Sequence, residues 1–254
     1  MRNVITIFQK EMNSYFRSPI AYGLMAFFGL ITGWFFYIAT AYFVKNSMMS
    51  MMQRGGPMDV NESVVRPVLM NVSVIGLFII PMITMRLFAE EKRQGTMELL
   101  ATSPITDLEI ILGKWFAALG MYCAVLAMPL ISLLVLYSYG KPDWKPIAVG
   151  FLGLVLQGGA LLALGAFLSN TTKNQIVAGV GTFAICLLLW VLDWVSSFES
   201  AAWAKVVAYM SVVAHFEPFS KGVIDSKDVI FFLSMIVFGL FLTARSMESM
   251  RWRS

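Results

Sequence analysis

The chain has 254 residues, of which 58% are hydrophobic and 13% are charged, and its formal net charge is +4. Soluble domains contain roughly 25% charged residues. A globule of this size could not bury so much apolar surface, because much of its own surface must face water. The composition therefore excludes an ordinary water-soluble protein and indicates one that lies in a lipid bilayer.

The first element expected in chain order is an amphipathic helix over residues 3–18. Apolar side chains recur there at spacings of three to four, and charged side chains occupy other positions. Such a helix lies in the membrane interface. Pro19 then disfavours helix at Ser18, so we expect residues 1–19 to form an interfacial helix followed by a turn into the membrane.

Six apolar stretches follow that are long enough, or nearly so, to cross a bilayer, since a crossing helix needs about 20 residues. They lack the alternating polarity of transmembrane strands. The predicted fold class is an all-α integral membrane protein with six transmembrane helices preceded by an N-terminal amphipathic interfacial helix. The predicted spans are Ile20–Val44, Val68–Met85, Trp115–Tyr139, Ile147–Leu168, Ile176–Val195 and Val229–Ala244.

An even number of spans places both termini on one side. With this threading, 11 of the 19 Lys and Arg residues lie on the side of the termini, and arginine divides seven to two in the same direction. Because basic residues are enriched on the cytoplasmic side of membrane proteins, we expect cytoplasmic termini.

Three external segments are expected, at Lys45–Pro67, Tyr139–Pro146 and Ser196–Asp228. The external segment 196–228 before the last span carries an apolar helical stripe that Pro218 and Gly222 interrupt. We expect one or two short helices that rest in the outer leaflet. The stripe consists of Ala201, Ala202, Val206, Val207, Met210 and Val213.

Residues 86–114, between spans two and three, have nine charged residues in 29 positions. A charge run alone is typical of a solvated loop, but the internal order of this one favours a structured helix-turn-helix elbow. Gly95 permits a break, and residues 96–101 can form a short helix that ends before Pro104. Thr106 and Glu109 have the spacing of a capping box, which starts a new helix leading into span three.

A family resemblance rests on this elbow. The sequence Glu90-Glu91-Lys92-Arg93-Gln94-Gly95-Thr96-Met97-Glu98-Leu99-Leu100, followed by Pro104 and Gly113-Lys114, resembles the signature of ABC-2 type transporter permeases. Three further motifs resemble the gliding-motility-associated ABC permease branch. These are Ser18-Pro19-Ile20-Ala21-Tyr22, Thr172-Lys173-Asn174-Gln175 and Phe219-Ser220-Lys221-Gly222-Val223-Ile224-Asp225.

The resemblance implies a single ABC-2 type transmembrane domain over residues 1–254 in the bacterial cytoplasmic (inner) membrane. It implies a second permease subunit, as a homodimer or a related heterodimer, and separate ABC ATPase subunits that bind ATP and Mg²⁺. The chain has no Gly-x-x-x-x-Gly-Lys-[Ser/Thr] motif, so it cannot hold nucleotide phosphates by that route. We expect no cofactor on this chain, no nucleic-acid partner and no enzymatic activity of its own.

In that family the elbow transmits closure of the ATPases to the spans. Its charges of both signs and its apolar residues suit contact with a soluble partner. The expected ATPase-coupling residues are Glu90, Glu91, Lys92, Arg93, Gly95, Thr96, Glu98, Leu99 and Leu100. The sequence does not separate those that touch the partner from those that cap local helix ends.

Small residues and prolines within the spans are further candidates. Gly29 and Gly33 in span one, with Gly158 and Gly159 in span four, permit close helix packing, inside one subunit or at a dimer interface or translocation path. Pro81 and Pro129 interrupt spans two and three, where a kink serves either gating or shape alone. They are our gating candidates.

Other polar and sulfur-containing residues fit structural roles better than chemical ones. Asp193 lies near the outer end of span five, with no further acid or histidine inside the spans to form a proton relay. His215 is the only histidine, so a zinc site or catalytic triad has little support. Cys123 and Cys186 fit buried small hydrophobes. The loop methionines Met48, Met49, Met51, Met52 and Met58 suit an adaptable apolar patch better than a Cu(I) site.

Two functions remain open at this point. The first is the permease subunit of an ATP-driven exporter, and the second is a membrane scaffold or force-transmitting component of a motility or envelope machine without solute transport. An intramembrane enzyme is weaker, because no nucleophile-base pair or metal set is visible. The sequence does not identify a substrate.

Overall fold

The computed structural model describes residues 2–52, 58–96, 105–140, 142–198, 207 and 209–251, and the regular elements within these ranges are helical. Six helices there are long and apolar enough to cross a membrane, which confirms the predicted fold class. The elements are α1 (Arg2–Arg17), α2 (Pro19–Met52), the π-helix η1 (Asn61–Val65), α3 (Arg66–Thr84), α4 (Ala89–Gln94), α6 (Asp107–Gly140), α7 (Trp144–Thr171), α8 (Gln175–Phe198), α10 (Val212–Ser220) and α11 (Ser226–Arg251).

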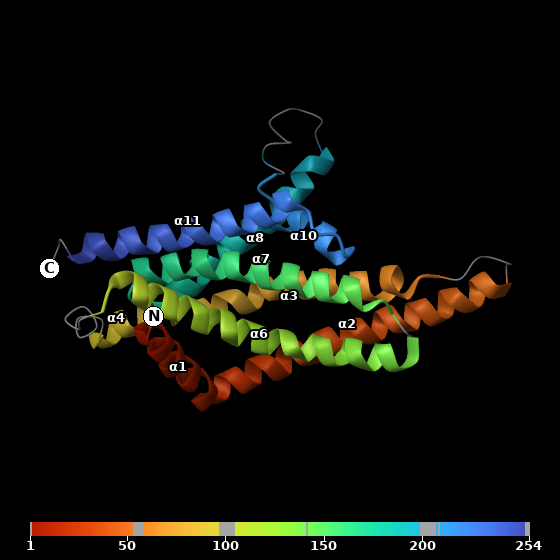
Figure 1. The fold of residues 1–254 in the computed structure, drawn as a ribbon, viewed down its shortest axis with the longest axis horizontal. Helices are drawn as coiled ribbons and strands as arrows, with labels where there is room; N and C mark the ends of the chain where they lie inside the picture. Colours follow the sequence, from red (N-terminus) through yellow and green to blue (C-terminus); the bar gives the residue numbers. More distant parts are fainter. Residues whose placement is uncertain are drawn as a thin grey trace.

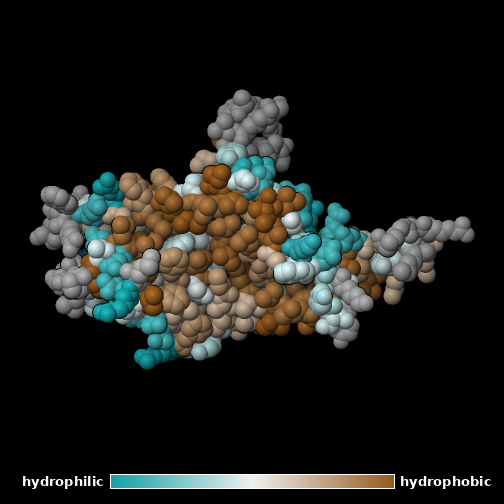
Figure 2. All heavy atoms as spheres, viewed as in Figure 1, coloured by the Kyte–Doolittle hydropathy of each residue, from teal (hydrophilic) through white to brown (hydrophobic). Residues whose placement is uncertain are grey.

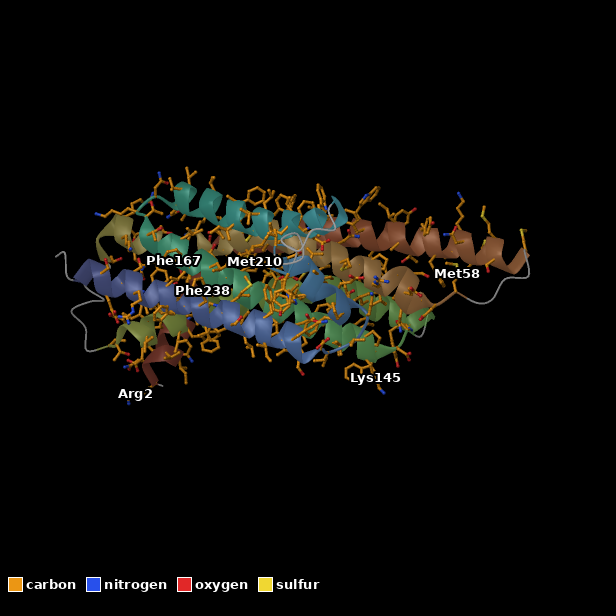
Figure 3. The ribbon with its side chains drawn as sticks, turned by 90° about the horizontal axis from the view of Figure 1, so that it is seen from above. Arg2, Met58, Lys145, Phe167, Met210 and Phe238 are labelled. Carbon is orange, nitrogen blue, oxygen red and sulfur yellow. The ribbon has the colours of Figure 1, made fainter. Side chains whose placement is uncertain are left out.

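The long helices run beside one another along the longest axis of the molecule (Figure 1). The start of α1, helix α4 and the end of α11 lie at one end, which we call the proximal end. The end of α2, the turn between α6 and α7, and η1 lie toward the opposite, distal end. Arg2 marks the proximal end, and Met58 and Lys145 mark the distal end (Figure 3).

The outer surface between these ends is apolar. Figure 2 shows a broad hydrophobic band with hydrophilic residues toward both ends. Large side chains such as Leu30, Trp34 and Val237 are more than 60% exposed on this surface. Because water would make such exposure costly, the band fits the hydrocarbon core of a bilayer.

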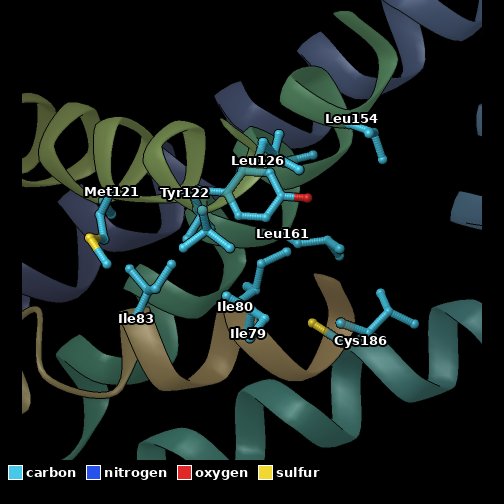
Figure 4. Packing of buried hydrophobic residues seen from close by; sticks show 14 of the residues in the cluster. Ile79, Ile80, Ile83, Met121, Tyr122, Leu126, Leu154, Leu161 and Cys186 are labelled. Atoms are coloured by element: carbon cyan, nitrogen blue, oxygen red, sulfur yellow. The ribbon is translucent and has the colours of Figure 1, made fainter. Parts of the chain in front are cut away.

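Helix α7 forms the centre of the bundle through glycines that admit neighbouring side chains. An added Cβ at Gly158 would collide with the ring of Tyr122, and one at Gly153 would lie 2.6 Å from Phe219 Cβ. Gly159 allows Trp115 and Ile236 to approach. Figure 4 shows part of the buried cluster around Tyr122. Close helix approach through small residues is the usual packing mode inside membranes.

The other candidate packing residues differ from one another. A Cβ added to Gly29 would lie 3.5 Å from Met128 Cβ, whereas one added to Gly33 would meet nothing within 4 Å. Pro81 and Pro129 both lie inside helices, and both are buried. Neither observation tests a gating role.

The two cysteines do not share one environment. Cys186 is buried, as predicted, but Cys123 is exposed on α6, so the prediction that both are buried is wrong for Cys123. Its side chain points out of the bundle, where lipid rather than protein would cover it. Neither cysteine is in a disulfide.

The first segment predicted to be external, Lys45–Pro67, contains helix in its described parts. Helix α2 continues through Lys45 to Met52, and η1 leads directly into α3. The glycines and proline of this segment, at positions 55–57, lie outside the described residues. Helix α2 therefore continues beyond the predicted end of span one at Val44, because the sequence contains no helix-breaking residue before Gly55.

The segment before the last span also differs from expectation. Helix α10 contains Pro218 instead of stopping before it, and it ends ahead of Gly222, whose φ is +80°. Its side chains Val212, Phe216 and Phe219 are buried in the bundle. The helix therefore packs into the protein and does not rest in the outer leaflet as predicted. Half of the expected apolar stripe, namely Ala201, Ala202 and Val206, lies outside the described residues.

Candidate functional site

The candidate site is the proximal elbow around α4, a helix of six residues. So short a helix depends on tertiary contacts, and the cap at its start comes from another element. The backbone amides of Phe88 and Ala89 donate hydrogen bonds of 3.0 and 3.2 Å to Ser169 Oγ of α7. At the other end Gly95 takes the left-handed conformation, with φ +72°, as C-terminal caps commonly require.

A buried ammonium joins the elbow to two other helices. Lys114 of α6 is 2% exposed, and its Nζ lies 2.9 Å from Glu11 Oε1 of α1 and 3.0 Å from Glu91 Oε1 of α4. The same Nζ lies 5.4 Å from the centre of the Phe88 ring. A charge this deeply buried requires partners of opposite sign, so this one group fixes the relative positions of α1, α4 and α6.

Further polar contacts hold α4 on α7 and on the chain that precedes it. Lys92 Nζ donates to the backbone carbonyl of Asn170 at the end of α7. Arg86 Nε donates to Glu90 Oε2 over 3.0 Å, and Gln94 Nε2 donates to Glu90 Oε1 over 3.1 Å. Helix α4 is therefore tied to α7 and to the preceding residues as well as to α6 and α1.

The start of α6 confirms the predicted capping box. The Glu109 amide donates to Thr106 Oγ1 over 3.3 Å, and the Thr106 amide donates to Glu109 Oε2 over 3.2 Å. Glu109 also accepts hydrogen bonds from Asn3 Nδ2 of 3.2 and 3.1 Å. The cap thus serves a second purpose, because it anchors the beginning of α1.

Helix α1 lies along α6, and its apolar face covers two glycines there. A Cβ added to Gly113 would lie 2.8 Å from Ile7 Cβ, and one added to Gly120 would lie 3.3 Å from Met12 Sδ. Near the end of α1, the Tyr15 hydroxyl donates to the Ile83 carbonyl over 3.4 Å. Burial, followed by the nearby Glu11 carboxylate, raises the pKa of Tyr15, so the phenol stays protonated and keeps this bond.

A groove of about 570 Å³ lies between parts of α1 and the elbow. Charges of both signs line it, including Lys10 and Glu11 from α1 and Arg86 and Glu90 from the elbow side. Most of these groups are engaged with one another, which leaves the C-terminal end of α4 as the more exposed contact surface. Arg93, Gln94 and Gly95 form that exposed surface.

The structure divides the predicted coupling residues into three groups. Arg93 and Gly95 are exposed, whereas Glu90, Glu91 and Lys92 are partly buried in contacts within the chain. Thr96 belongs with this second group, because it is partly buried and its Oγ1 donates to the Glu91 carbonyl over 3.3 Å. Glu98, Leu99 and Leu100 lie outside the described residues.

Sequence reasoning missed the residues that hold the elbow from outside. Glu11, Ser169 and Asn170 belong to α1 and α7, and Lys114 was part of a motif without an assigned contact. A lysine and a glutamate on apolar helix faces signal a buried pair, but the sequence does not say which residues pair. The described residues contain no group of three His, Cys, Asp or Glu side chains that could hold a metal ion. The contacts described here join α1, α4, α6 and α7 to one another.

Comparisons with known proteins agree with this architecture. A family model described as "ABC-2 family transporter protein" matches residues 5–221. The chain is 24% identical over 168 residues to the "Probable multidrug ABC transporter permease YbhR" of Escherichia coli K12, and equally to that of Escherichia coli O157:H7. The match covers 65% of this chain and 44% of each relative, so the chain matches less than half the length of these curated relatives.

Proposed function

The chain belongs to the ABC-2 family of transporter membrane proteins, and on that basis we propose that it is the permease subunit of an ATP-driven exporter. It would work with a second permease subunit and with separate ATPase subunits that bind ATP and Mg²⁺. Residues 86–114 would form the coupling elbow. The gliding-motility branch remains a prediction from the sequence motifs alone.

One observation carries this proposal, namely that α4 is exposed at its C-terminal end and fixed by contacts along the rest of its length. Arg93 and Gly95 face outward, while Glu91 pairs with Lys114 of the third span and Lys92 binds the end of the fourth. A push on the exposed side therefore reaches two spans through short polar contacts. Such a connection suits a soluble subunit that changes shape during its nucleotide cycle.

The same reasoning favours a cytoplasmic proximal end. Basic residues at that end include Arg17, Arg86, Arg93 and Arg245, whereas the distal end carries mainly lysine. This distribution follows the positive-inside tendency. ATP is present in the cytoplasm, so this orientation would also place the elbow on the side where an ATPase partner could reach it.

The test is a charge reversal at the exposed surface of the elbow. Arg93→Glu should reduce co-purification of the ATPase with the tagged full-length chain and reduce ATP hydrolysis by the complex. Lys45→Glu is the matched control, since Lys45 is also exposed but lies on the part of α2 toward the distal end. Equal ATPase binding and hydrolysis in wild type and Arg93→Glu would refute the proposed contact.

The control also addresses insertion in the membrane. Both variants should reach the membrane in equal amounts, because neither residue packs in the core. For the substrate, apolar drug-like molecules are the first class to test, because the relatives in Escherichia coli are named as probable multidrug permeases. Vectorial movement of such a molecule in proteoliposomes that contain the complete complex would support export, and ATP hydrolysis without movement would oppose it.

A further inference from the structure

A buried histidine and a buried aspartate meet between α10 and α11, toward the distal side and far from the elbow. His215 is 4% exposed and Asp228 is 1% exposed. His215 Nδ1 lies 2.6 Å from Asp228 Oδ1, and His215 Nε2 lies 2.8 Å from the backbone carbonyl oxygen of Tyr209. The imidazole ring also stacks on Phe231, with 3.8 Å between ring centres. None of these contacts of the imidazole ring has a role in the proposed coupling.

The two short contacts determine how many protons the pair holds. A carbonyl oxygen only accepts hydrogen bonds, so His215 Nε2 must carry a proton. At 2.6 Å a second proton must lie between Nδ1 and Asp228 Oδ1, since two lone pairs would repel. The pair therefore holds two protons, as imidazolium with carboxylate or as imidazole with carboxylic acid. Either form is neutral overall, which suits a buried site.

Loss of one proton would break this arrangement. A neutral imidazole has a single N–H. Beside an ionised carboxylate it can donate to Asp228 or to the Tyr209 carbonyl, but not to both. The pair would then carry a net negative charge in a buried site, and Asp228 Oδ2 has no hydrogen-bond partner among the described residues. Such a charge is costly unless water or a donor reaches it, and separation of α10 from α11 would admit water.

Other ionisable groups lie on the elements packed against the pair. Asp225 pairs with Lys227, at 3.1 Å, and Glu217 pairs with Arg66 and Lys221, at 2.8 and 2.9 Å. The Tyr209 ring lies edge-on to His215, with 4.8 Å between ring centres. The groups on these elements are Tyr209, Glu217, Lys221, Asp225 and Lys227, with Arg66 on α3, Lys145 on α7, and Cys186 and Asp193 on α8.

We propose that His215 and Asp228 form a proton-dependent latch that holds α10 against α11 and releases it as the pH at the distal side rises. The direction follows from linkage, because the docked state holds a proton that the released state gives up at high pH. Low pH therefore favours docking. The ligand of this site is the proton itself, and the element it controls is the external helix α10.

The experiment measures how readily a thiol on the buried face of α10 reacts. Val212→Cys places the thiol at a position that is 1% exposed, and Ala214→Cys places one on the exposed face of the same helix. Both are made in the full-length chain in proteoliposomes, with Cys123 and Cys186 replaced by alanine. A membrane-impermeant maleimide is added across a pH series. The rate at position 212 is divided by the rate at position 214, which removes the pH dependence of the thiol reaction.

In the chain with an intact latch, this ratio should rise with pH by up to about tenfold per pH unit while the proton is lost. Asp228→Asn is the decisive variant. Its side-chain amide can donate to Nδ1 of a neutral imidazole whose Nε2 still donates to Tyr209, so both contacts persist without the extra proton. The ratio should then stay low at every pH. Asp225 lies three residues earlier and pairs with Lys227. In Asp225→Asn the ratio should still rise with pH.

Two results would overturn the latch. One is a ratio that does not change with pH in the chain that retains His215 and Asp228. The other is an Asp228→Asn chain with the same rise. Because asparagine matches aspartate in shape, this variant avoids the cavity that His215→Ala would leave, and equal size-exclusion profiles would verify that it folds.

Discussion

The buried Lys114 ammonium gives the sharpest prediction about how the elbow is held. Lys114→Met keeps most of the volume of the side chain but removes its charge from between Glu11 and Glu91. The two carboxylates are 17% and 13% exposed and lie 2.9 and 3.0 Å from the ammonium. Removing one partner of a buried ion pair typically costs about 3–5 kcal/mol, because the remaining charge stays buried without compensation. We expect a loss of this size in the free energy of unfolding.

A neighbouring lysine provides the matched control. Lys10 Nζ lies 3.5 Å from Glu91 Oε1, but its side chain is 64% exposed. Exposed ion pairs contribute about 0–1 kcal/mol, so Lys10→Met should have little effect. The assay is SDS titration of the purified chain in mixed micelles, with helix content as the readout.

A rescue experiment separates the charge from the packing. Combining Lys114→Met with Glu11→Gln and Glu91→Gln removes the uncompensated carboxylates, so most of the lost stability should return. If Lys114→Met is no more destabilising than Lys10→Met, or if the combined variant is as unstable as Lys114→Met alone, the ammonium does not hold the three helices together.

Two further predictions concern the bundle and its distal side. Gly158→Ala should lower the free energy of unfolding by about 1–3 kcal/mol, because it forces a methyl group into Tyr122. At Gly33 an added Cβ meets nothing within 4 Å, so Gly33→Ala should not destabilise the single chain. Equal losses of stability for the two variants in the same SDS titration would contradict this packing. A hydrogen bond from Lys221, together with the charges of Lys221 and Arg66, holds the pKa of Glu217 below its ordinary value of 4.5. The ionised Glu217 therefore stabilises the fold above that pH, and this stabilisation is lost as the pH falls through the lowered pKa. Between about pH 6 and about pH 3, wild type should lose more free energy of unfolding than Glu217→Gln. Parallel plots of that free energy against pH for the two chains would count against this ion pair.

Local patterns in the sequence predicted the spans and the helix starts well. Runs of about 20 apolar residues give the six crossing helices directly, since lipid imposes that length. The Thr106 and Glu109 spacing predicted a capping box because both partners lie within one turn. The helix at residues 3–18 followed from its periodicity. Each of these features depends on residues that are close in the chain.

Long-range contacts were beyond sequence reasoning. Lys114 and Glu11 are 103 positions apart, and His215 and Asp228 belong to different helices. We judged His215 by the absence of a second histidine or a nearby cysteine pair, which overlooked an aspartate 13 positions later. Pro218 was taken as a helix breaker, although it lies in the last turn of α10 and the helix ends two residues later. Burial of α10 depends on the glycine-lined surface of α7, which the local sequence of α10 does not encode.

The attachment of α1 gives the bilayer a mechanical role. Helix α1 is fixed to α6 by Ile7 and Asn3 and to the elbow through Glu11 and Lys114, and it leads into α2 through a single bend at Ser18 (Figure 1). In the proposed coupling, a movement of α4 would stretch these contacts or carry α1 with it. An amphipathic helix moved in this way would displace lipid headgroups, so lateral pressure in that leaflet would oppose the proposed movement of α4.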